Sequence, residues 1–97
     1  MPDVTATAAK LRHIAASDHV MPAELSALAS QVFELCGVAR ADADIAAEVA
    51  VWAQLHGSDS HGAVHLPLYV RGLLDRTIKC RPNFVTTQAM PCCVVLD

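Results

Sequence analysis

Two amphipathic segments joined by a very short link constrain the fold of this chain most. Residues 22–37 and residues 42–57 both place apolar side chains at the three- and four-residue spacing of one helix face. Pro22 suits the first position of a helix, and Gly37 suits the residue just past its end. Because only residues 38–41 join the two segments, we predict an antiparallel helical hairpin.

The apolar positions of these segments predict a core. Asp42 is placed to cap the second helix, and Gly57 is placed to end it. The expected core stripe of the first helix is Leu25, Leu28, Ala29, Val32, Leu35 and Cys36, and that of the second is Ile45, Ala46, Val49, Trp52 and Ala53.

The rest of the chain adds a third helix and a short β segment. Residues 66–76 form a third amphipathic pattern, with Pro67 in its first turn. The apolar run at residues 94–96 predicts a buried strand, and the pattern at residues 84–87 predicts a second strand at the edge. The fold class is therefore mainly α, a helical hairpin plus a third helix, ending in one or two β-strands. Residues 1–21 are weakly patterned, so we expect a flexible extension with at most one helical turn.

Composition excludes several classes of protein. The 97 residues are 54% hydrophobic and 18% charged, which is too apolar for a disordered chain and suggests that more protein covers part of the surface. The net charge is −3 and basic residues form no long run, so nucleic-acid binding is not expected. No signal sequence or long apolar run is present, which favours a cytoplasmic protein without membrane insertion.

The four cysteines form no C-x-x-C pair. They are Cys36, Cys80, Cys92 and Cys93. This pattern predicts reduced, mostly buried thiols in a reducing compartment rather than a disulfide framework.

The stretch GSDSHGAVHLPLYV, residues 57–70, concentrates the side chains that could perform chemistry. His61 lies on a predicted turn and is of the residue type that both gives and takes a proton near neutral pH. Consecutive side chains do not face each other on a helix, which argues against Ser60 as a nucleophile activated by its neighbour. A plain polar turn between helices explains the same residues. A zinc site is a further alternative, because His61 and His65 are four residues apart, with His56 and Asp59 nearby.

GSDSHGAVHLPLYVRGL resembles the D-S-H-G-x-x-R-L-P-x-Y-V signature of the malate/L-lactate dehydrogenase-like family. That family includes ureidoglycolate, sulfolactate and piperideine-2-carboxylate oxidoreductases. The similarity continues upstream through both predicted helices and downstream to the valine-rich strand, so that it covers about residues 22–97. The cofactor-binding portion of the family begins where this chain ends, at Asp97.

The resemblance implies an oxidoreductase that transfers a hydride between NAD or NADP and a small 2-hydroxy or 2-oxo acid, such as malate or lactate, or a cyclic imine acid. Its catalytic pair would be His61, as general acid–base, and Ser60, as the orienting partner in a relay with a distant aspartate. His65 and Tyr69 would bind the substrate. His65 stands where the family usually has arginine, and it offers a carboxylate one hydrogen bond instead of two.

The resemblance also implies that residues 22–97 are the N-terminal helical part of a larger α/β, non-Rossmann fold that forms a homodimer. Residues 1–97 alone would then be inactive, with the cofactor-binding residues outside them. A second hypothesis comes from the apolar composition. It is a small helical module that associates with itself, with a variant that binds metal through His61 and His65.

Overall fold

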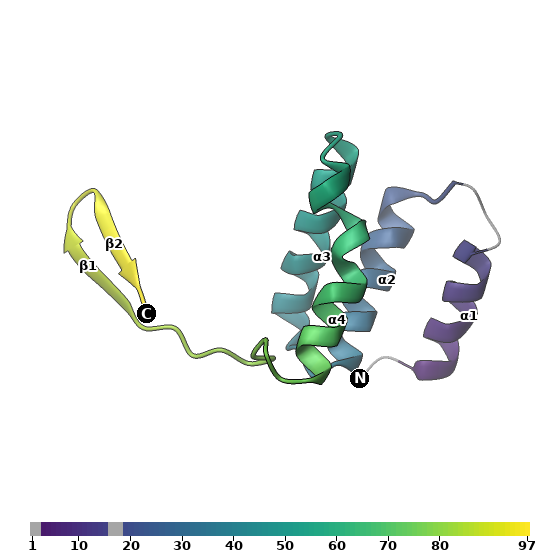
Figure 1. Ribbon diagram of the computed structural model, residues 1–97, viewed down its shortest axis with the longest axis horizontal. Coiled ribbons are helices and arrows are strands. Elements are labelled where there is room, and N and C mark those ends of the chain that lie inside the picture. The colour runs from purple at the N-terminus through teal and green to yellow at the C-terminus, as the bar shows by residue number, and fades with distance from the viewer. Residues whose placement is uncertain (1–2, 16–18) are drawn as a thin grey trace.

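The computed structural model describes residues 3–15 and 19–97 (Figure 1). Four α-helices and two short 3₁₀ turns are followed by a two-stranded antiparallel sheet. The elements in chain order are α1 (Val4–Ala15), α2 (Pro22–Leu35), α3 (Arg40–Leu55), η1 (Asp59–His61), η2 (Ala63–His65), α4 (Leu66–Leu74), β1 (Thr86–Met90) and β2 (Cys93–Leu96).

The predicted helical hairpin is confirmed by α2 and α3, which lie side by side (Figure 1). Pro22 opens α2, and Gly37 follows it with φ of +100°, a left-handed conformation that glycine adopts without a steric penalty. The prediction that Asp42 caps α3 is wrong. The helix begins earlier, at Arg40, because the extended backbone of Ala39 precedes it, and Asp42 lies in its first turn.

The core lies where α2, α3 and α4 meet, and small side chains make up much of it. The buried apolar residues are Leu28, Ala29, Phe33, Ala43, Ala47, Ala50, Val51 and Leu73. Ser30, also buried, donates a hydrogen bond from its hydroxyl to the Asp44 carboxylate and so links α2 to α3.

The predicted core stripe of α3 is wrong. Ile45, Val49 and Trp52 have 61–62% of their surface exposed, whereas Ala43 and Ala47 are fully buried. The alanine face packs against α2 because side chains without bulk allow two helices to approach closely. In α2 the prediction holds better, since Leu28 and Ala29 are buried and the other members of its stripe are half-buried.

Residues 4–15 form a full helix, where the sequence predicted at most one helical turn near residues 8–16. The Asp3 carboxylate accepts a hydrogen bond from the Thr5 backbone N–H at 2.9 Å and caps the start of α1. Thr7 is buried against α2, and its hydroxyl donates to the Gln31 side chain at 3.4 Å. Packing against α2 therefore supports a helix whose own sequence pattern is weak. Residues 1–2 and 16–18 lie outside the described residues.

The C-terminal hairpin confirms the two predicted strands but not their burial. β1 and β2 pair with Thr87 opposite Val95, and Val85 and Asp97 exchange backbone hydrogen bonds of 2.7 and 2.8 Å beyond the strand ends. The hairpin stands apart from the helices along an extended connection and contacts none of the described helices (Figure 1). Val94, Val95 and Leu96 are therefore 50–61% exposed instead of buried.

None of the helices in the described ranges is long and apolar enough to cross a membrane.

Candidate functional site

The turn from α3 to α4 carries the predicted site residues. Gly57 ends α3 with φ of +79°, and two 3₁₀ turns follow. They are closed by backbone hydrogen bonds from His61 N–H to the Ser58 carbonyl oxygen at 3.0 Å and from His65 N–H to the Gly62 carbonyl oxygen at 3.1 Å. Gly62 lies between the two turns with a non-helical backbone, at ψ of −141°, and α4 starts directly after the second turn, so the backbone path runs from α3 through both turns into α4.

This path brings three of the four predicted site residues into a ladder of rings. The ring centroids of His61 and His65 are 5.7 Å apart, and those of His65 and Tyr69 are 5.8 Å apart. The second pair is nearly parallel, with an interplanar angle of 28°. Residues four positions apart lie on one face of a helix, and this spacing is maintained across the 3₁₀ turns. We call His61, His65 and Tyr69 the ring ladder.

Ser60 completes the set through a direct hydrogen bond to His61. Its Oγ lies 2.8 Å from His61 Nδ1, although consecutive side chains do not face each other on an α-helix. The pair lies in a three-residue 3₁₀ turn and not inside an α-helix, which allows the neighbouring side chains to meet. Either the hydroxyl donates to Nδ1 or the ring N–H donates to Oγ, and in both cases Nε2 remains for another partner. Both side chains are exposed.

Gln54, at the end of α3, holds this turn in place and was not predicted. Its side-chain oxygen accepts a hydrogen bond from the Ala63 backbone N–H at 3.2 Å. Gly62 is buried directly against it, and a Cβ at Gly62 would lie 2.5 Å from Gln54 Oε1 and 3.1 Å from Gln54 Cα. The glycine that follows His61 is therefore required for close packing on α3. The glycine of the S-H-G sequence was the one feature from which a close contact at this turn could have been predicted.

An apolar groove of about 640 Å³ begins at Tyr69. It runs between α3, α4 and residues 78–84, and Ile45 and Val49 line its α3 side. Ser60, His61 and His65 do not line this groove; Ser60 and His61 are exposed, and His65 is half-buried.

The surroundings of the ring ladder do not by themselves fit a nicotinamide dinucleotide. Such a cofactor is held in a deep cleft that buries most of its surface. Ser60 and His61 are both exposed, and the groove beside them reaches only Tyr69 of the ladder. Nor do the described residues contain a group of three or more His, Cys, Asp or Glu side chains placed to hold a metal ion. The chemistry that this surface offers is proton transfer and hydrogen bonding.

Comparison with known proteins shows the family to which the chain belongs. Residues 20–97 match the family model described as malate/L-lactate dehydrogenase. The chain belongs to this family. The match confirms the resemblance seen in the sequence around His61 and covers α2 to β2. Comparisons with curated proteins and with solved structures found no match. Membership indicates an oxidoreductase of the dehydrogenase type.

Proposed function

We propose that this chain supplies the proton-transferring residues of an NAD- or NADP-dependent oxidoreductase that acts on a small 2-hydroxy or 2-oxo acid or a cyclic imine acid. The observation that carries the proposal is the hydrogen bond between Ser60 and His61 on an exposed turn, within a chain of the malate/L-lactate dehydrogenase family. The bound nicotinamide would supply or remove the hydride.

His61 is the general acid–base of this proposal. When the substrate carbonyl is reduced, negative charge develops on its oxygen, and a protonated imidazole placed there neutralises that charge by giving up its proton. In the reverse direction the neutral ring takes the hydroxyl proton. Such positioned proton transfer contributes about 10²- to 10⁴-fold to a rate. Ser60 holds the ring through Nδ1, which directs Nε2 toward the substrate.

His65 and Tyr69 are the proposed contacts of the substrate carboxylate. Both follow His61 on the ring ladder, so a small acid whose oxygen lies at His61 could extend along the same face. His65 replaces the two parallel hydrogen bonds of the usual arginine by one, and the Tyr69 hydroxyl offers a second donor. Carboxylate binding would then depend on two side chains.

The larger assembly is part of the same proposal. The surroundings of the ring ladder do not fit a dinucleotide, so we propose that residues outside this chain bind the cofactor within a larger α/β, non-Rossmann fold, and that the complete enzyme is a cytoplasmic homodimer. Isothermal titration of residues 1–97 with NADPH should show no binding. Micromolar affinity would contradict this part of the proposal.

The decisive experiment is His61→Ala in the protein expressed from its complete reading frame. Single-turnover hydride transfer, followed by nicotinamide absorbance, should slow by about 10²- to 10⁴-fold. His56→Ala is the matched control, since His56 is an exposed histidine that stacks on Trp52, with ring centroids 4.0 Å apart, outside the ladder. If His61→Ala stayed within a few-fold of the parent, the role assigned to His61 would be wrong.

A second candidate function is the self-associating helical module. Its supporting observation is the apolar surface formed by Ile45, Val49 and Trp52, all more than 60% exposed, together with the exposed hairpin. Sedimentation of residues 1–97 tests it, because a module would dimerise in a way that Trp52→Glu abolishes. A monomer at all concentrations would exclude it.

A further inference from the structure

Gln54 contacts both ends of the loop that carries the proposed general acid–base. Where the loop begins, the Gly57 backbone N–H donates to the Gln54 carbonyl oxygen at 3.3 Å. Where it ends, the Ala63 backbone N–H donates to Gln54 Oε1 at 3.2 Å. One residue of α3 therefore closes residues 57–63 into a compact loop, with its backbone at one end and its side chain at the other. We call residues 57–63 the His61 loop.

The side-chain contact of this closure is tightly packed and partly shielded from water. Gln54 is half-buried, and the buried Gly62 lies so close to its side chain and backbone that no Cβ fits between them. The hydrogen bond from Ala63 to Gln54 is made beside this contact. Partial burial makes the bond costly to lose, because the Ala63 N–H would give up this acceptor without full access to solvent.

The ring of His61 depends on this loop for its position. His61 is exposed, so packing by neighbouring side chains does little to fix it. Within the part of the chain that the structure describes, its ring contacts the Ser60 hydroxyl, at 2.8 Å, and the His65 ring, with centroids 5.7 Å apart. Ser60 belongs to the same loop and moves with it. The position of the ring therefore follows the backbone of the His61 loop.

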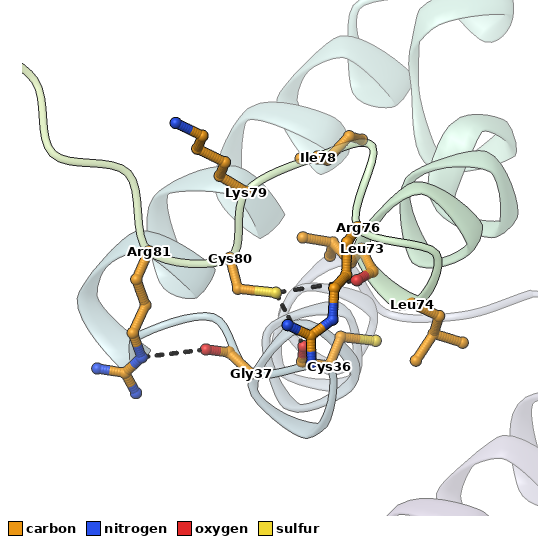
Figure 2. A pocket seen from close by; sticks show the side chains of 9 residues that line it. All are labelled: Cys36, Gly37, Leu73, Leu74, Arg76, Ile78, Lys79, Cys80 and Arg81. Atoms are coloured by element: carbon orange, nitrogen blue, oxygen red, sulfur yellow. Dashed lines mark hydrogen bonds between the residues drawn. The ribbon is translucent and has the colours of Figure 1, made fainter.

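The other two rings of the ladder are placed by α4, which is anchored separately at its far end. Leu73 is buried in the core, and Figure 2 shows the Cys80 thiol between the Cys36 carbonyl oxygen, at 3.2 Å, and the Leu73 carbonyl oxygen, at 3.9 Å. These contacts tie the end of α4 to the end of α2. His65 directly precedes α4 and Tyr69 lies within it, so both follow this helix. Only the first ring of the ladder depends on the His61 loop.

We infer that Gln54 is a positioning residue of the proposed enzyme: by closing the His61 loop on α3, it sets where the His61 ring stands relative to His65. This inference rests on the function proposed for His61. Gln54 transfers no proton and acts only through the backbone of the loop. Because a displacement on the order of 1 Å of a reacting group can cost about 10²-fold in rate, this closure affects catalysis from outside the reacting atoms.

The first test is kinetic and uses the protein expressed from its complete reading frame. Gln54→Met removes the acceptor oxygen and keeps the length of the side chain, so single-turnover hydride transfer should slow by about 10- to 10²-fold. KM should stay within a few-fold, because His65 and Tyr69 are unchanged. Gln54→Glu keeps an acceptor for the Ala63 N–H and should restore most of the rate. Gln31→Met is the matched control, since Gln31 contacts α1 instead.

A double-mutant cycle shows whether Gln54 acts through His61. In a His61→Ala background, Gln54→Met should lower the rate no further, because the group that it positions is already gone. Equal losses in both backgrounds would mean that Gln54 supports the fold in general, and would overturn the inference. A Gln54→Met rate close to that of the parent, beside a slow His61→Ala, would overturn it as well.

NMR of the full 97-residue chain tests the position of the ring without any assumption about the reaction. In Gln54→Met, the nuclear Overhauser effect between the His61 and His65 rings should be lost, and exchange of the Ala63 amide proton should quicken by about 10-fold. Both should return to parental values in Gln54→Glu. The contact between the His65 and Tyr69 rings should persist in every variant and shows that α4 is intact.

The two tests separate this inference from the function on which it rests. If His61→Ala left hydride transfer unchanged, the proposed function would fail, and the spectra alone would decide whether Gln54 positions the ring. A contact between the His61 and His65 rings that is unchanged in Gln54→Met would overturn the inference whatever the kinetics show.

Discussion

The two faces of α3 show how side-chain size decides what is buried. One face carries Ala43, Ala47 and Ala50 and lies in the core, whereas the other carries Ile45, Val49 and Trp52 and is mostly exposed. Both are apolar, and hydrophobicity alone favours burial of the larger face. The alanine face is buried because it allows α2 to approach closely, so that backbone and small side chains pack without gaps.

The largest loss of stability should come from a truncation in the apolar cluster that packs against the buried face of α3. Leu73→Ala removes a side chain that is 6% exposed and packs with Phe33 and Ala43. Such a truncation costs about 2–5 kcal/mol, which is a large fraction of the stability of a small domain. Urea unfolding followed by circular dichroism measures it. The neighbouring Leu74→Ala, at a position 67% exposed, is the control and should change stability by less than about 0.5 kcal/mol.

The alanine face itself is tested by adding volume. Ala47→Leu places three extra carbons in a fully buried position and should cost about 1–3 kcal/mol through overpacking. Ala46→Leu puts the same atoms on the exposed face one residue earlier and should be nearly neutral. Equal losses for the two variants in the same urea titration would mean that the faces do not differ as the structure shows.

Close approach continues at the C-terminal end of α3, where Gly62 packs on Gln54. Gly62→Ala would place Cβ 3.1 Å from Gln54 Cα, and the backbone cannot move aside as a side chain can. We expect a loss of roughly 1–3 kcal/mol and a shift of the His61 ring resonances in NMR spectra. Adding Gln54→Ala should recover only part of the stability, because it removes the side-chain contact and leaves the backbone contact. Full recovery would show that the side chain alone is decisive.

A substitution on the exposed face of α3 should change the free energy of unfolding only slightly. Val49→Ser replaces a side chain that is 61% exposed, so the unfolding free energy of the isolated chain should change by less than about 0.5 kcal/mol. A loss above 1 kcal/mol that depends on protein concentration would indicate that another copy covers this face.

The smallest effect is expected at the surface turn after α4, away from both faces of α3. The Thr77 hydroxyl, 2.8 Å from Asp75 Oδ1, and then the Thr77 backbone N–H lower the pKa of Asp75. A carboxyl with a lowered pKa contributes stability above its unfolded pKa and loses it as the pH falls through the folded pKa. Thr77→Val should raise the Asp75 pKa toward its ordinary value, and an NMR titration should show this. An unchanged titration would contradict the assignment to Thr77.

Much of the local structure follows from the sequence because short-range rules determine it. Pro22 and Gly37 bracket α2, and the spacing of His61, His65 and Tyr69 places their rings on one face. The family resemblance around His61 also came from adjacent residues, and the family match confirms it.

Long-range contacts decided the rest. The face of α3 that is buried depends on how closely α2 approaches, and α1 forms because Thr7 packs against a helix that follows it. The contact between Gln54 and Gly62 and the meeting of Cys36 with Cys80 join residues that no sequence period relates. Periodicity states which side chains share a face, but only the packing of whole elements determines which face excludes water, because burial depends on the shape and bulk of both partners.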